Sequence, residues 1–193
     1  MMPGGDNPDF DLVVVGASWG GLGALKWLFE GLPASFPTPV VVAQHRSTGS
    51  SDVMLRVLRD HSSLVLAEAL DKDVIETGHV YLAPADYHLI VEPGTLALST
   101  DHFVNHSRPS IDVTFESAAD SYGERLVGVI LTGANQDGSA GLKRIRDAGG
   151  VAVVQDPATA ARPEMPSAAI AAVKSARVLP LRKIAPFLVE ICR

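Results

Sequence analysis

The sequence contains one cysteine, Cys192, so the chain offers neither a disulfide framework nor a cluster of thiolate metal ligands. It also lacks any apolar run near the ~20 residues of a membrane-spanning helix, and residues 1–8 have no signal-peptide core. Basic residues are the minority, 16 Lys and Arg against 22 Asp and Glu, which argues against a nucleic-acid partner. These absences predict a cytoplasmic protein with no direct membrane insertion.

The composition that remains is that of a folded chain. Hydrophobic residues make up 47% of the 193 positions and charged residues 20%, which excludes intrinsic disorder for the chain as a whole. Pro, Gly, Asn and Asp dominate residues 1–9, and we expect these residues to form a disordered tail. Residues 10–193 are of a length that suits one domain.

Short apolar runs alternate with segments of helical spacing along most of the chain. We expect strands at 11–16, 40–44, 126–131, 151–154 and 178–179, and helices at 20–29, 52–59, 111–121, 138–148, 167–174 and 181–191. Strands that are apolar on both faces are typical of a parallel sheet covered by helices on each side. The alternation therefore predicts a three-layer α/β/α fold with a doubly wound, mostly parallel sheet.

A different pattern occupies residues 64–100. Four short apolar runs begin at Leu64, Val80, His88 and Thr95, and turn signals at 77–78, 84–86 and 93–94 divide them. This pattern predicts hairpins, and we interpret the segment as a β-hairpin insertion in the parallel sheet. The polar residues 101–109 that follow are expected to form an ordered loop.

Three chemically complementary side chains follow three of the predicted strands. Ser18 comes after the first strand, His45 after the second, and Asp137 after the strand that ends at Leu131. In open parallel sheets, ligands bind beyond the carboxyl ends of the strands. A serine, a histidine and an aspartate on that rim form the set that a nucleophilic hydrolase uses for attack, proton transfer and orientation of the imidazole.

Other interpretations of these residues remain open. Each of the three, taken alone, is more often a cap, a turn or a structural residue. Residues 16–23 also resemble a loosened dinucleotide fingerprint, although the second strand ends without the carboxylate that would hold a ribose. Arg46 is available there for a 2′-phosphate. A catalytically inert scaffold that binds a helical partner is a third alternative. A metal site is not among the alternatives, because the histidines show no metal-ligand spacing.

Six motifs occur in a characteristic order. They are GASWGG (16–21), AQH (43–45), PADYH (84–88), RPSID (108–112), LTGANQDGSAG (131–141) and QDPATA (155–160). Together they resemble the effector domain of the CheB-type chemotaxis methylesterases, from about Phe10 to Ile191. The resemblance implies a cofactor-free serine hydrolase that removes methyl groups from glutamate γ-methyl esters of chemoreceptors and deamidates receptor glutamines. It also implies a catalytic Ser18, His45 and Asp137, and a methylated receptor's cytoplasmic helical bundle as the partner.

The sequence departs from the family pattern beside these residues. Trp19 replaces a typical threonine, Ala134 replaces a methionine, and residues 46–51 lack the usual proline and phenylalanine. We expect the backbone N–H groups of Trp19 and Ala134 to hold the oxyanion, and the Trp19 indole to pack on the following helix. The family commonly carries a receiver domain ahead of the effector domain. The nine residues at 1–9 leave no room for one, so we expect the chain to be constitutively competent, with its rate set by access to the receptor. Control by a separate receiver protein in trans is the alternative.

Overall fold

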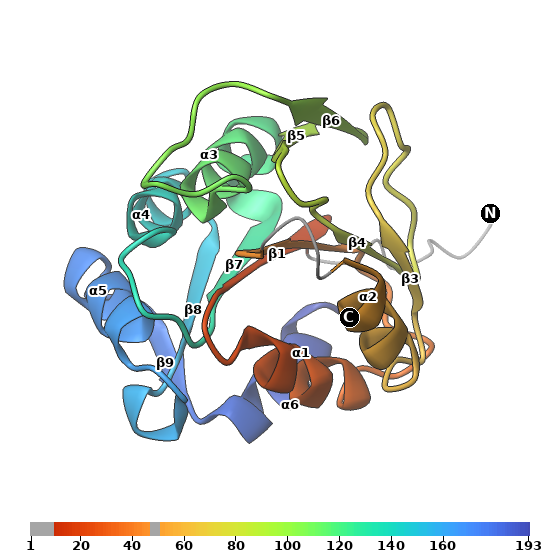
Figure 1. The fold of residues 1–193 in the computed structure, drawn as a ribbon. Helices are drawn as coiled ribbons and strands as arrows, with labels where there is room; N and C mark the ends of the chain where they lie inside the picture. Colours follow the sequence, from red (N-terminus) through yellow and green to blue (C-terminus); the bar gives the residue numbers. More distant parts are fainter. Residues whose placement is uncertain (1–9, 47–50) are drawn as a thin grey trace, which may run out of the picture.

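A seven-stranded sheet forms the centre of the protein (Figure 1). In the computed structural model, which describes residues 10–46 and 51–193, every pairing between neighbouring strands is parallel. The strand order is β3-β4-β2-β1-β7-β8-β9. The strands are β1 Leu12–Ala17, β2 Val40–Gln44, β3 Val65–Glu68, β4 His79–Leu82, β7 Leu126–Ile130, β8 Val151–Gln155 and β9 Arg177–Leu179. The tail expected at residues 1–9 lies outside the described residues.

Helices cover both faces of this sheet. Because successive side chains of a strand point to opposite faces, Val13, Val15 and Ala17 of β1 enter one core, whereas Leu12 and Val14 enter the other. The first core is closed by α1 Gly21–Glu30, α2 Ser51–Arg59 and α6 Leu181–Ile191, and the second by α3 Ile111–Tyr122, α4 Ser139–Asp147 and α5 Glu164–Ala172. Two short 3₁₀ turns, η1 Gly123–Arg125 and η2 Pro157–Thr159, join elements. The predicted three-layer α/β/α fold is confirmed.

One β-hairpin lies outside the main sheet, as Figure 1 shows beside α3. Strands β5 His88–Glu92 and β6 Thr95–Ser99 pair antiparallel, and Leu89 and Leu96 pack into the core shared with α3. The prediction of hairpins across all of residues 64–100 is wrong for its first half. Strands β3 and β4 are parallel members of the main sheet, because Val80 and Leu82 of β4 are fully buried beside β2.

The centre of the sheet is where the winding direction changes. Strand β1 lies between β2 on one side and β7 on the other, so the chain leaves β1 toward one edge and later returns on the opposite side. Such a switch point opens a crevice beyond the carboxyl ends of the strands. The three residues singled out in the sequence all follow strands that meet at this point: Ser18 follows β1, His45 follows β2 and Asp137 follows β7.

Candidate functional site

A tight turn between β1 and α1 presents Ser18. The Gly21 N–H donates to the Ser18 carbonyl at 2.8 Å, and Gly20 has φ 79° and ψ 0°, the values of the third position in a type II turn. Only glycine adopts this conformation without strain, and a Cβ on Gly20 would also lie 2.6 Å from the Ala161 Cβ. The turn thus fixes Ser18, half-buried, at the end of the central strand.

Gln44 joins the backbones of Ser18 and His45. Its side chain is 3% exposed, and its Nε2 donates to the Ser18 carbonyl at 2.9 Å and to the His45 carbonyl at 2.8 Å. The amide oxygen of Gln44 lies against the α carbon of Gly21, where an added Cβ would be only 1.9 Å away. A glycine at position 21 is therefore required for this arrangement.

The three predicted side chains lie in one line. His45 Nδ1 is 3.1 Å from Ser18 Oγ, and His45 Nε2 is 2.7 Å from Asp137 Oδ2. Since an ionised carboxylate only accepts hydrogen bonds, the ring proton is assigned to Nε2, which donates to Asp137. Nδ1 is then left as the acceptor for the Ser18 hydroxyl. The His45 side chain is 13% exposed and Asp137 is fully buried, so the line runs from solvent into the protein.

Asp137 accepts hydrogen bonds at both carboxylate oxygens. The Ile111 N–H donates to Oδ2 at 2.7 Å, beside the bond from His45. Oδ1 accepts from Asn105 Nδ2 at 2.9 Å, Ser110 Oγ at 3.0 Å and the Asp112 N–H at 3.2 Å. Two of these donors belong to the first turn of α3, where unpaired N–H groups and the helix dipole favour an anion.

These contacts set the ionisation of Asp137. Burial by itself would raise the pKa of this carboxyl, but the hydrogen bonds from His45, Asn105 and Ile111 outweigh it and lower the pKa to about 2. Asp137 is thus an anion at neutral pH. Its neighbour Asp112 has the opposite shift, because burial and then the charge of Asp137 raise its pKa to about 6 against the hydrogen bond from Gly141.

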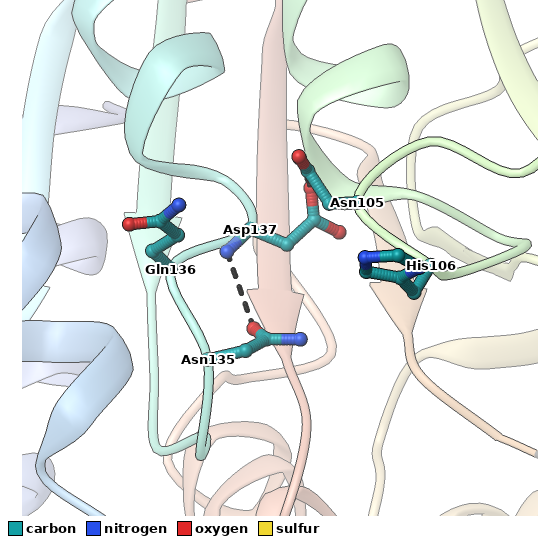
Figure 2. Close-up of a pocket in the computed structure, with 5 residues that line it drawn as sticks. All are labelled: Asn105, His106, Asn135, Gln136 and Asp137. Atoms are coloured by element: carbon teal, nitrogen blue, oxygen red, sulfur yellow. Dashed lines mark hydrogen bonds between the residues drawn. The ribbon is translucent and has the colours of Figure 1, made fainter.

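Two open cavities adjoin this line of side chains. A cavity of about 440 Å³ is lined by Asn105, His106, Asn135, Gln136 and Asp137. Figure 2 shows that these residues come from two loops that face each other, with the Asn135 amide oxygen accepting from the Asp137 N–H at 3.2 Å. A second cavity, of about 340 Å³, is lined by His45, Arg46, Phe103, His106, Ser107, Arg108 and Pro109. A side chain from a partner protein therefore has space beside His45.

The expectation that Trp19 packs on the following helix is wrong. Its side chain is 69% exposed, because the residue stands in the turn before α1 begins and belongs to no face of that helix. Ala134, in the loop after β7, is also exposed. Within the described part of the chain, the backbone N–H groups of Trp19 and Ala134 donate no hydrogen bond, so both are available to a ligand.

The arrangement around Arg46 does not favour a dinucleotide. The Arg46 side chain is 1% exposed and its Nη2 donates to Glu68 Oε2 and to the Ala83 carbonyl, each at 2.6 Å. It is therefore paired inside the protein and not offered to a 2′-phosphate. In the described ranges there is no group of three or more His, Cys, Asp or Glu side chains placed to hold a metal ion. No helix in the same ranges is long and apolar enough to cross a membrane.

Three residues of this site were not singled out by the sequence analysis. Asn105 and Ser110 contact Asp137, and Gln44 ties Ser18 to His45. The sequence does give a signal for Ser110, because a serine immediately before a predicted helix is a preferred N-cap. In the structure its Oγ accepts a hydrogen bond from the Val113 N–H. Gln44 lies in the AQH motif, but the motif does not indicate that its amide binds two backbone carbonyls. Asn105 lies in an irregular loop outside the six motifs, so the sequence gives no signal for it.

Known proteins resemble this chain over nearly its whole length. The family model described as CheB methylesterase matches residues 13–188. A putative protein-glutamate methylesterase/protein-glutamine glutaminase of Leptospira interrogans is 44% identical over 184 residues, which are 95% of each chain. A protein-glutamate methylesterase/protein-glutamine glutaminase of Anaeromyxobacter dehalogenans is 41% identical over 95% of this chain, but the match spans only 54% of that longer protein.

A solved structure agrees with these matches. The crystal structure of the CheB methylesterase catalytic domain from Thermotoga maritima superimposes with a TM-score of 0.89 and 34% identity, covering 94% of this chain and 98% of that one. The fold of this chain is therefore that of a known catalytic domain. This chain belongs to the CheB methylesterase family.

Proposed function

We propose that this protein is a protein-glutamate methylesterase that uses Ser18 as nucleophile, His45 as general base and acid, and Asp137 as the group that orients His45. The observation that carries the proposal is the unbroken line from Ser18 Oγ through His45 to Asp137, with distances of 3.1 and 2.7 Å. The names of the related proteins support a hydrolase over a dinucleotide-binding protein or an inert scaffold. The proposed substrate is a glutamate γ-methyl ester.

The proposed reaction has two halves. Ser18 Oγ attacks the ester carbonyl carbon while its proton passes to His45 Nδ1, and the buried Asp137 carboxylate stabilises the imidazolium that forms. His45 then gives this proton to the methoxy oxygen, the ester C–O bond breaks, and methanol leaves. Water attacks the acyl-enzyme with His45 as base and releases glutamate and free Ser18. Water and these side chains supply every nucleophile and proton, so the reaction needs no cofactor.

The negative charge of each tetrahedral intermediate needs hydrogen-bond donors. We assign this role to the backbone N–H groups of Trp19 and Ala134. Trp19 lies within the Ser18 turn and Ala134 within the loop after β7. Removal of one oxyanion donor typically costs a factor of about 10²–10³ in turnover. Since both are main-chain groups, the replacement of a threonine by Trp19 and of a methionine by Ala134 leaves them in place.

The same site fits a carboxamide. Attack on a glutamine side chain would release ammonia in place of methanol through the same acyl-enzyme, as the glutaminase part of the relatives' names suggests. We propose that both substrates lie on the cytoplasmic helical bundle of a methylated chemoreceptor. A helix approaching side-on can place one side chain in the cavity beside His45.

Methanol release from a methyl-esterified receptor tests this function. The wild-type protein should release methanol, and Ser18→Ala should lower the rate by several orders of magnitude with an unchanged circular dichroism spectrum. Asp137→Asn should lower turnover by about 10⁴, as expected when the imidazole loses the partner that fixes its tautomer. Similar rates for Ser18→Ala and wild type would refute the mechanism.

A further inference from the structure

The Asn105 amide links the proposed triad to a second carboxyl group. Asn105 Nδ2 donates to Asp137 Oδ1 at 2.9 Å and to Asp112 Oδ2 at 2.8 Å. An amide nitrogen carries two hydrogens, so each carboxyl receives one. The other oxygen of Asp112 accepts from the Gly141 N–H at 2.7 Å. Asn105 thus stands between α3, which carries Asp112, and the loop after β7, which carries Asp137.

The backbone around Asn105 is built to hold this amide in place. Val104 and Ser107 exchange two hydrogen bonds, of 3.2 and 2.9 Å, across a tight turn. The two central residues, Asn105 and His106, have φ values of 51° and 60°, as in a type I′ turn, which favours asparagine at these positions. The turn sends the Asn105 amide toward Asp137, and His106 lines the cavity beside it (Figure 2).

We propose that Asn105 is a positioning residue for the esterase reaction, acting on His45 through Asp137. The inference rests on the function proposed above. The amide holds Oδ1 of Asp137, so that Oδ2 stays aligned with His45 Nε2. It also supplies a donor to each of two buried carboxyls that would otherwise face one another. Among the described residues, the other charged groups that act on this pair are His45 on Asp137 and Glu116 on Asp112.

Two substitutions remove the amide without straining the turn. Asn105→Gly keeps a residue that tolerates positive φ, and Asn105→Asp keeps both the shape and this tolerance but replaces the donor by an acceptor. Val104→Thr is the matched control, because it alters an exposed residue of the same turn that lines neither cavity and makes no bond to Asp137. Groups that orient a directly acting ligand at metal sites are typically worth about 10- to 100-fold in activity, and we expect a loss in this range.

The first measurement is the pH profile of methanol release. Asn105→Gly should lower kcat by about 10- to 100-fold at pH 7 with little change in KM, and Asn105→Asp should lower it further. Without the amide, more negative charge stays on Asp137 Oδ2, which favours protonated His45, so the acid limb of the profile should move to higher pH. Val104→Thr should leave the acid limb where it is. A merely structural role for Asn105 would scale the rate without moving the limb.

The second measurement needs no substrate. The short Nε2–H···Oδ2 bond of His45 should give a downfield proton resonance in the NMR spectrum of the free protein. Asn105→Gly should broaden or shift this resonance, and Val104→Thr should preserve it. An unchanged resonance together with kcat within twofold of wild type in Asn105→Gly would overturn the inference. If wild type and Ser18→Ala release methanol equally slowly, the proposed function fails, and the resonance still decides the positioning role.

Discussion

At the scale of single residues, the hydrogen-bond partners of the two His45 ring nitrogens define the chemistry of the site. His45 has its Nε2 proton committed to Asp137, so Nδ1 is the nitrogen that faces Ser18. In the serine protease arrangement the two ring nitrogens serve in the reverse order. What both arrangements share is a fixed tautomer, and here a fully buried carboxylate with five donors around it enforces that tautomer.

Trp19 is exposed beside the nucleophile, which leads to a prediction about substrate binding. We expect Trp19→Thr to raise the KM for methylated receptor several-fold while changing the unfolding temperature by less than a few degrees. An indole that is 69% exposed loses little buried surface when it is truncated, whereas it adds apolar area at a protein contact. Receptor titration and thermal unfolding measure the two effects.

Trp27 provides the comparison for this variant. It is also partly exposed, at 45%, but it lies on α1 with the Arg182 guanidinium 4.3 Å from its ring centroid. Trp27→Thr should therefore lower the unfolding temperature more than Trp19→Thr does and leave the KM closer to wild type. A large fall in unfolding temperature for Trp19→Thr with unchanged kinetics would contradict the role that we give to its indole.

At the scale of elements, two glycines of α1 make a matched pair. A Cβ on Gly21 would meet the Gln44 side chain at 1.9 Å, whereas a Cβ on Gly23 would meet nothing within 4 Å. We expect Gly21→Ala to displace Gln44 from the carbonyls of Ser18 and His45, which should lower kcat at least tenfold and cost about 1–3 kcal/mol of stability. Gly23→Ala should keep kcat and add up to about 1 kcal/mol from helix propensity.

Activity assays and chemical denaturation of both variants decide this point. Equal kcat values for Gly21→Ala and wild type would mean that the Gln44 contacts do not position the nucleophile. The Gly23 variant controls for the general effect of placing an alanine in the first turns of the helix.

The N-terminus of α3 brings two carboxyls together, with a consequence for stability. The ordinary aspartate pKa is 3.8, and that of Asp112 is raised to about 6 in the folded protein. Between these values the folded protein holds a proton that the unfolded chain has released. The charged form therefore increasingly disfavours folding as the pH rises from about 4 to 6, and the full penalty remains above pH 6.

Asp112→Asn removes this titration. The amide also loses one of the two acceptor contacts of the carboxyl, which lowers stability by an amount that does not depend on pH. The informative quantity is thus the difference in unfolding temperature, variant minus wild type, which should become more positive from pH 4 to pH 7. Asp101→Asn, at an exposed site, controls for the loss of one negative charge. A flat difference for Asp112→Asn would contradict the raised pKa.

At the scale of the whole molecule, the sequence carries most of the fold and part of the site. The strand expected at 40–44 coincides with β2, because its three consecutive valines favour a strand and the run is apolar enough to be buried on both faces. The pairing of β3 with β4 could not be predicted, since a short apolar strand is the same in sequence whether it joins a hairpin or a parallel sheet. Asn105 could not be predicted because it lies in an irregular loop and follows no strand of the main sheet, whereas Ser18, His45 and Asp137 each follow such a strand.

The two cores share one sheet, and this predicts cooperative unfolding. Leu188 on α6 and Ile145 on α4 are fully buried on opposite faces, and truncating either to alanine should cost about 2–5 kcal/mol. Since β1 and β7 contribute side chains to both cores, the cavity left by either truncation should destabilise the whole sheet.

For both variants, far-ultraviolet circular dichroism, tryptophan fluorescence and methanol release should be lost in one coincident transition. Because both side chains lie outside the Ser18–His45–Asp137 line, kcat below that transition should match wild type. The contrary result is two separate transitions in the Ile145→Ala variant, in which activity is lost while the tryptophan fluorescence near α1 is still native. This result would show that the two faces unfold independently, and that α3 and its hydrogen bonds to Asp137 are lost first.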